Sequence, residues 1–151
     1  MLKPIICVAC EKVIVDQQEV ASLISLFNKI NASVLAGSPE VPKNAVSPKE
    51  WAIFSAWDCE LGDERKKYVH CTQVLYPDRS RFSEIVKLPM HIEPPKRSQV
   101  IVNLMGFPVG QPGRYTIQTW IEENEETVVG PIDFTIEVEI SKQEHIQLVT
   151  S

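Results

Sequence analysis

Residues 103–121 have the sequence NLMGFPVGQPGRYTIQTWI, in which two apolar segments flank a corner rich in glycine and proline. Proline restricts φ and glycine accepts conformations that other residues avoid, so five such residues mark a sharp turn of the chain. They are Gly106, Pro108, Gly110, Pro112 and Gly113. Beyond the corner, Tyr115, Ile117 and Ile121 share one face of a strand. Two strands joined by a rigid corner with a tyrosine at its exit are typical of β-sandwiches.

The same alternation recurs along the rest of the chain. In residues 132–140 every second position is apolar, which indicates a strand with one buried face. Residues 51–59 are apolar on both faces, as expected of a central strand, and residues 82–88 alternate like a half-exposed one. We therefore expect an all-β fold, a two-sheet antiparallel sandwich of about eight or nine strands. It should form one domain over residues 1–151, with a frayed polar tail at 141–151.

Residues 20–36 are compatible with two structures. Their apolar side chains recur at helical spacing, but they also alternate as two strands on either side of a bend at Asn28 and Lys29. The residues at helical spacing are Val20, Leu23, Ile24, Phe27 and Ile30. Periodicity alone supports helix and strand equally here.

The order of these segments resembles an uncharacterised bacterial family of small single-domain proteins with an Ig-like β-sandwich and no known function. The resemblance is carried by residues 22–32, by 51–57 with the strand that ends at 75–78, and by 106–115 followed by Pro131 and Ile132. Arg79 stands where the family usually has glycine. The resemblance implies strands rather than a helix over residues 20–36, and it implies no catalytic residues.

The overall charge argues against two classes of partner. The chain has 151 residues and a formal net charge of −5, which disfavours binding to nucleic acid or to anionic membranes. Three basic segments at 65–67, 79–81 and 96–97 would form a basic patch only if they converge. No apolar run approaches the ~18 residues that a membrane-spanning helix requires. The N-terminus lacks the length and the cleavage site of a signal peptide, so we expect a cytoplasmic protein.

Cysteines and histidines are the residues that could support catalysis or metal binding. Cys7 and Cys10 have the spacing of half a zinc site, but residues three apart on a strand point to opposite faces. A Cys59–His70 pair across a hairpin is the remaining candidate for a nucleophile and its base. The sequence has no phosphate loop, zinc-protease motif or serine-nucleophile motif. We therefore expect buried thiols, no metal, no cofactor and no enzymatic activity.

Trp120 is the best candidate for contact with a partner. It should lie with Arg114 and Gln118 on the outer face of its strand, because Tyr115 and Ile117 define the inner face. A large aromatic side chain on a polar face is a candidate binding hot spot, unless another part of the chain covers it. We assign Pro108, Pro112, Gly113 and Tyr115 to the structure of the corner rather than to binding.

These observations predict a protein of unknown function that is most simply a non-enzymatic interaction or self-assembly module. Its partner would be an unidentified protein or a second copy of the chain. The alternative is a sandwich that binds a small ligand or a carbohydrate on a concave face lined by aromatic rings. The rings available for such a face are Trp51, Trp57, Tyr68 and Tyr76. An enzyme that depends on zinc or cysteine is the remaining hypothesis.

Overall fold

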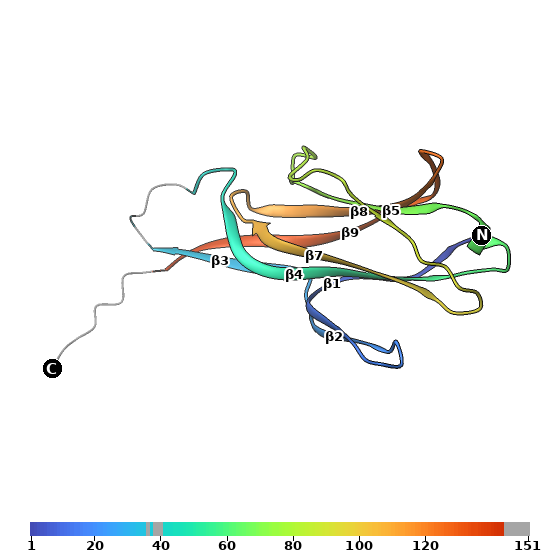
Figure 1. The fold of residues 1–151 in the computed structure, drawn as a ribbon. Helices are drawn as coiled ribbons and strands as arrows, with labels where there is room; N and C mark the ends of the chain where they lie inside the picture. Colours follow the sequence, from blue (N-terminus) through green and yellow to red (C-terminus); the bar gives the residue numbers. More distant parts are fainter. Residues whose placement is uncertain (36, 38–40, 144–151) are drawn as a thin grey trace.

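The computed structural model describes residues 1–35, 37 and 41–143, and it is all-β, with two packed sheets (Figure 1). The four-stranded sheet has the order β2 (Ala21–Leu26), β1 (Lys3–Val15), β4 (Val46–Asp58) and β7 (Ser98–Pro108). The five-stranded sheet has the order β3 (Lys29–Leu35), β9 (Glu126–Gln143), β8 (Gly113–Glu123), β5 (Tyr68–Leu75) and β6 (Val86–Pro89). A short 3₁₀ helix, η1 (Asp63–Arg65), leads into β5. Within the described residues, no helix is long and apolar enough to cross a membrane.

Six of the strand pairs are antiparallel, as expected, but the pair of β3 with β9 is parallel. The chain leaves β2 in one sheet and enters β3 in the other, turning at Phe27 and Asn28. It therefore arrives at the edge beside β9 running in the same direction as that strand. Residues 21–26 and 29–35 are both strands, so the family resemblance gave the correct choice between helix and strand.

The core lies between the sheets and contains a series of aromatic rings near the corner. Phe27, Trp51, Phe107, Tyr115, Tyr76 and Phe82 follow one another with centroids 5.0–6.0 Å apart. Such edge-to-face and tilted contacts add to the stabilisation that comes from burying the rings. Three of them, Trp51, Phe107 and Tyr115, are at most 2% exposed. The alternation in β4 and β8 directs Trp51 and Tyr115 inward, whereas Phe107 turns inward because the alternation of β7 breaks at Gly106, whose φ is 90°.

The corner at residues 106–113 connects β7 to β8. The Tyr115 hydroxyl donates to the Gln111 carbonyl at 2.8 Å and accepts from the Gln111 N–H at 3.2 Å. Gly106 and Gly113 have φ of 90° and 128°, which side chains disfavour. At Gly110 an added Cβ would lie 2.2 Å from the Pro42 carbonyl oxygen. The tyrosine and the glycines thus fix the turn between the two sheets.

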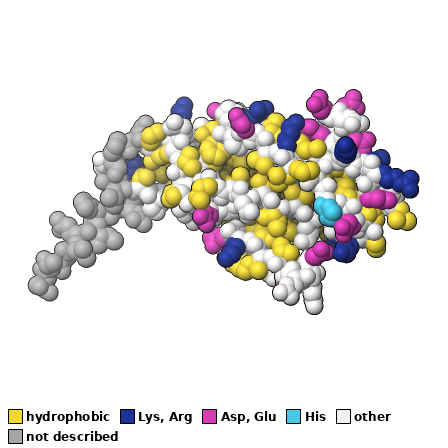
Figure 2. Space-filling model, in the orientation of Figure 1, with side chains coloured by type: hydrophobic (Ala, Val, Ile, Leu, Met, Phe, Trp, Pro, Cys, Tyr) yellow, Lys and Arg dark blue, Asp and Glu magenta, His cyan; other side chains and the backbone are white. Residues whose placement is uncertain are grey.

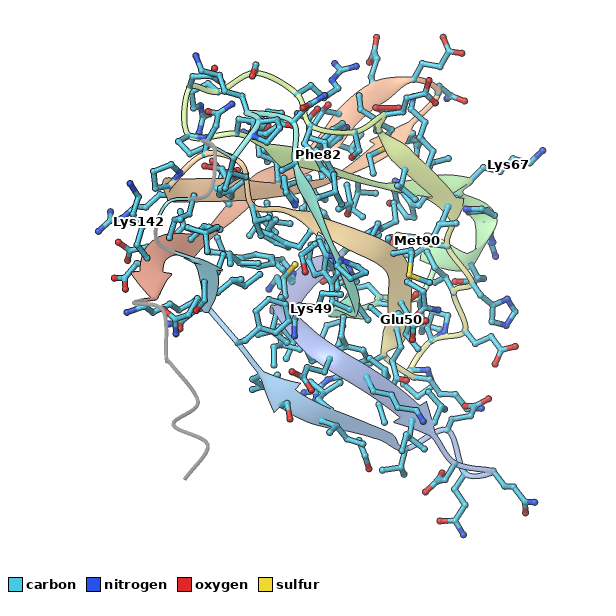
Figure 3. All side chains as sticks on the ribbon, turned by 90° about the vertical axis from the view of Figure 1, so that its left-hand side faces the viewer. Lys49, Glu50, Lys67, Phe82, Met90 and Lys142 are labelled. Atoms are coloured by element: carbon cyan, nitrogen blue, oxygen red, sulfur yellow. The ribbon has the colours of Figure 1, made fainter. Side chains whose placement is uncertain are left out.

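The hairpin formed by the second half of β1 and by β2 leaves the plane of its sheet. Only residues up to Cys10 of β1 pair with β4, and residues 10–15 pair with β2 instead. The hairpin lies below β4 in Figure 1 and projects from the lower part of the molecule in Figure 3. At its tip, Lys96 forms an ion pair with Glu19 at 3.3 Å, and Gln99 donates to the Glu19 carbonyl. The hairpin therefore crosses the outer face of the four-stranded sheet and reaches β7.

This crossing explains an unusual burial pattern in β4. Ala52, Phe54 and Ala56 face away from the core, yet they are 1%, 5% and 6% exposed. The hairpin lies over this outer face, and its half-buried Val13 and Leu23 belong to the side opposite its exposed isoleucines. The expectation that residues 51–59 are covered on both faces is confirmed, with the hairpin supplying the second cover.

Two expectations about strand boundaries are wrong. Residues 82–88 do not form one strand, because only Val86–Pro89 is β6 and Phe82 instead packs its ring on Tyr76. The frayed tail does not begin at residue 141, because β9 continues to Gln143 beside β3. Residues 144–151 lie outside the described part of the chain. Near Gly130, which has a φ of 91°, the register between β8 and β9 shifts.

Candidate interaction surfaces

Trp120 lies on the outer face of the five-stranded sheet, as the alternation of β8 predicts, where it pairs with Cys71 of β5. The indole is half-buried, and its N–H donates to Glu122 at 2.9 Å. Glu122 also accepts from Lys87 of β6 at 3.1 Å. The tryptophan therefore has local polar partners and remains partly accessible. Lys87 and Trp120 both pair with Cys71, whose side chain is fully buried although it faces outward.

The two other residues predicted for this surface differ in their environment. Gln118 is half-buried and accepts from Gln73 Nε2 at 2.7 Å, forming a cross-strand amide pair next to Trp120. Arg114 is exposed, but it lies two same-face positions beyond Gln118. The structure thus places Gln118 beside Trp120 and leaves Arg114 at the other end of the strand. Burial raises the pKa of the Cys71 thiol to about 11, which makes a reactive thiolate unfavourable there.

A second apolar surface was not singled out by the sequence patterns. The side of the β1–β2 hairpin that faces away from the sheet carries Ile14, Ile24 and Leu26, which are 45%, 42% and 58% exposed. Val20, immediately before β2, is 55% exposed. We call these four residues the hairpin face. The absence of charge and proline from residues 20–27 was the signal that could have revealed it.

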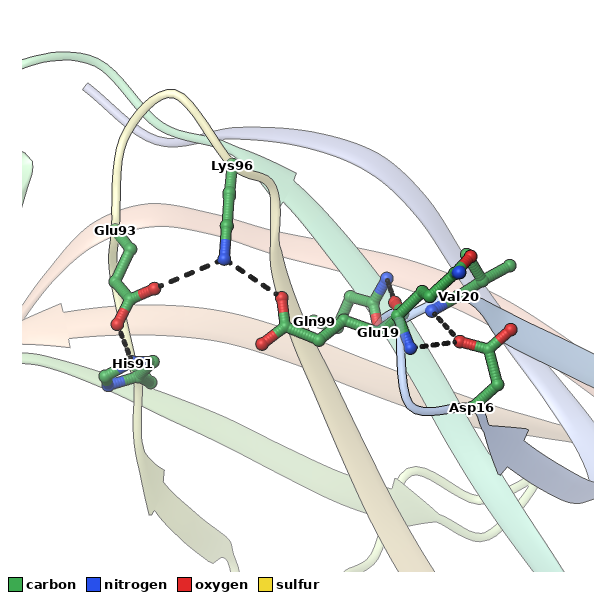
Figure 4. A network of polar contacts seen from close by, with 8 residues as sticks. Asp16, Glu19, Val20, His91, Glu93, Lys96 and Gln99 are labelled. Atoms are coloured by element: carbon green, nitrogen blue, oxygen red, sulfur yellow. Dashed lines mark hydrogen bonds and ion pairs between the residues drawn. The ribbon is translucent and has the colours of Figure 1, made fainter.

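A cleft of about 570 Å³ separates the hairpin tip from the loop before β7. Figure 4 shows Lys96 between Glu19 and Glu93, at 3.3 and 3.7 Å, and His91 bonded to Glu93 at 2.7 Å. The hydrogen bond to Glu19 raises the pKa of Lys96, and the hydrogen bond from His91, followed by the charge of Lys96, lowers the pKa of Glu93. All four side chains are more than half exposed, so the ion pairs hold the tip weakly.

The candidate catalytic groups are enclosed in the core or kept apart. His70 is fully buried and its Nε2 bonds the Ser55 hydroxyl at 2.9 Å, while Ser55 Oγ accepts from the Trp57 indole at 3.0 Å. Cys59 instead contacts the Trp57 carbonyl. Burial lowers the pKa of His70 to about 4. A serine–histidine pair sealed in this way has no access to a substrate.

Of the four cysteines, Cys10 and Cys71 are buried as expected, whereas Cys7 and Cys59 are only partly buried. Cys7 faces the core, where its thiol contacts the Thr119 hydroxyl at 3.7 Å, while Cys10 pairs with Ala52 on the opposite face. Burial raises the pKa of both thiols. Within the described residues, no group of three or more histidine, cysteine or acidic side chains lies close enough to hold a metal ion.

The aromatic residues proposed for a ligand-binding face belong to the core. Trp51, Trp57 and Tyr68 are at most 4% exposed, and Tyr76 makes an edge-to-face contact with Phe82 and a tilted contact with Tyr115. The three basic segments do not all converge, because residues 65–67 precede β5 and residues 79–81 follow its far end. Scans against protein-family models and against curated proteins gave no match to this chain.

Figure 2 shows how the surface is divided on one flank of the molecule. Hydrophobic side chains extend along the length of this flank, and charged side chains of both signs gather at its rims and ends. The charges are therefore mixed rather than segregated into one basic or acidic field.

Proposed function

We propose that this protein is a non-enzymatic interaction or self-assembly module. The observation that carries this proposal is the hairpin face, on which four large aliphatic side chains between 42% and 58% exposed lie on one projecting element. Clustered exposed apolar residues mark binding surfaces more often than isolated ones do. Trp120 and Gln118 offer a second, smaller contact surface on the other sheet.

We also infer that the sandwich is Ig-like, that the protein is cytoplasmic and that it belongs to the bacterial family that it resembles. The tyrosine that bonds the backbone of the corner supports the first inference, because Ig-like domains use a similar device. Binding to a small ligand or a carbohydrate has less support, because three of its four proposed rings are buried.

The proposal is tested by removing the hairpin face without changing the fold. We would replace Ile14, Ile24 and Leu26 with threonine, which keeps the strand propensity while removing apolar surface. The matched controls are Met105→Thr and Leu61→Thr, since both side chains are exposed and lie outside the hairpin. Trp120→Ala is examined in parallel.

Two measurements are made on each folded variant, namely self-association by sedimentation velocity and retention of proteins from an extract of the source cells. We expect the hairpin variant to lose self-association or partner retention, and the two controls to keep both. Circular dichroism and thermal melting establish that each variant is folded. If the hairpin variant and Trp120→Ala both behave as the native protein does, the proposed function is wrong.

A further inference from the structure

The free edge of β2 is suited to pairing with another strand. In the described chain β2 pairs with β1 on one side, and no strand pairs with its other side. Residues 20–27, VASLISLF, contain no charge and no proline. Edge strands commonly avoid pairing by carrying such residues or by being short. In the other sheet, the edge strand β6 has four residues including Lys87 and Pro89, and β3 begins with Lys29, whereas β7, the other edge of the four-stranded sheet, also has no charged residue.

The direction of the backbone groups in β2 follows from its pairing with β1. The Val20 carbonyl accepts from the Asp16 N–H, so the backbone groups of Val20 face β1. Hydrogen-bonded residues alternate along an antiparallel pair, and the register joins Ser22 to Ile14. The N–H and C=O groups of Ala21 and Leu23 therefore face the free side of the strand.

From this geometry we propose that two copies of the chain associate by antiparallel pairing of their β2 strands, around a two-fold axis at Ser22. This inference rests on the proposed interaction function and names the partner. In this register the backbone of Ala21 in one copy exchanges two hydrogen bonds with the backbone of Leu23 in the other. The two-fold axis generates a second, identical pair from Leu23 of the first copy and Ala21 of the second. The two sheets then continue across the interface as one.

The side chains of this pairing are complementary. Val20 of each copy lies opposite Ile24 of the other, so the exposed apolar groups at both ends of the pair cover each other. Glu19 falls opposite Ser25, and no two like charges face each other. A strand from an unrelated protein would need a matching apolar pattern, whereas a second copy supplies it by symmetry.

Ser25 limits how far the pairing extends. Its φ of 57° interrupts the extended backbone, so residues 20–24 form the segment that can pair regularly. An isologous contact around a two-fold axis closes on itself, so it yields dimers rather than filaments. The contact is short, and we expect dimers that dissociate on dilution.

Ser22 provides a direct test because it is exposed and lies opposite its own copy on the axis. Ser22→Lys and Ser22→Glu each place two like charges side by side, and we expect each dimer to be roughly fivefold weaker. An equal mixture of the two variants should form a mixed dimer at least as tight as the native one. Sedimentation equilibrium from micromolar to millimolar protein, at low salt, measures the dimer dissociation constants of the native protein, of each variant and of the mixture.

A second variant acts on the backbone. Ala21→Pro removes an outward N–H from each copy and leaves the bonds between β2 and β1 in place. We expect this variant to be folded and monomeric. If it does not fold, the mixture of charged variants decides the question alone.

A native protein that is monomeric at every concentration would overturn the inference. So would a dimer that is indifferent to both charges at Ser22, or one whose charged variants fail to restore each other on mixing. A monomer that still retains a partner through the hairpin face would contradict self-pairing and leave the interaction function standing. A native protein that neither self-associates nor retains a partner would refute the self-pairing and the interaction function together.

Discussion

His70 gives the sharpest prediction about stability, because it is a titratable group enclosed between the two sheets. Its ring is 0% exposed, and its Nε2 bonds Ser55, whose oxygen already accepts from the Trp57 indole. Its Nδ1 has no hydrogen-bond partner among the described residues. A second proton on the ring would therefore be buried without an acceptor, which explains why burial lowers its pKa from 6.5 to about 4.

The sign and the size of the effect on stability follow from proton linkage. Between pH 6.5 and about 4 the unfolded chain has His70 protonated while the folded protein keeps it neutral, so acid favours unfolding. The free energy of unfolding should fall as the pH decreases through this window and level off below it. At about 1.36 kcal/mol per pH unit, the His70 contribution amounts to about 3 kcal/mol.

Urea denaturation at intervals between pH 7 and pH 4, on the native protein and on His70→Gln, measures this contribution. The glutamine can bond Ser55 but does not titrate, and the exposed carboxylates affect both proteins alike. We expect the native protein to lose about 3 kcal/mol more than the variant over this range. Parallel profiles would mean that His70 accepts a proton in the folded state, and the reasoning from its burial would fail.

Three further predictions concern the corner and the outer face of the five-stranded sheet. Tyr115→Phe removes the hydroxyl that bonds the corner backbone, and urea denaturation should show a loss of about 1 kcal/mol. Gly110→Ala places a methyl group against the Pro42 carbonyl, and we expect a loss of about 1–3 kcal/mol; an unchanged midpoint would mean that the neighbouring loop moves freely. Cys71 is fully buried with a raised pKa, so iodoacetamide at pH 8 should leave it unmodified in the native state. Trp120→Ala should increase the rate of Cys71 alkylation several-fold. Equal alkylation rates in the native protein and the variant would show that the indole does not shield the thiol.

The features that the sequence predicts correctly depend on local chemistry. The corner follows from glycine, proline and the tyrosine at fixed offsets, and the outward direction of Trp120 follows from the period of two in β8. The burial of both faces of β4 follows from its uninterrupted apolar sequence. In each case neighbouring residues contain the whole signal.

Most of the features that the sequence does not predict depend on contacts between distant segments. The pairing of the first part of β1 with β4, and the contact of the hairpin tip with β7, involve residues more than forty positions apart. By contrast, the failed strand at residues 82–88 has a local cause, because Phe82 packs against Tyr76, six residues earlier, instead of following the alternation. The parallel pairing of β3 depends on where β9 ends, which no local pattern encodes.

The candidate surface follows the same rule. Alternation can place Ile14 and Ile24 on one face, but it cannot decide which side of a hairpin faces the sheet. The lack of charge in residues 20–27 was visible in the sequence, and its meaning became clear once β2 was found at an edge.

Hydrogen exchange of the β2 amides, followed by nuclear magnetic resonance at several protein concentrations, tests the central claim most directly. The amides of Ala21 and Leu23 face the free edge, whereas those of Ser22 and Ile24 bond β1 in every state. We predict that Ala21 and Leu23 exchange rapidly in dilute protein and become protected as the concentration rises, while Ser22 and Ile24 are unaffected. Exchange at Ala21 and Leu23 that stays fast and independent of concentration would contradict association through this edge.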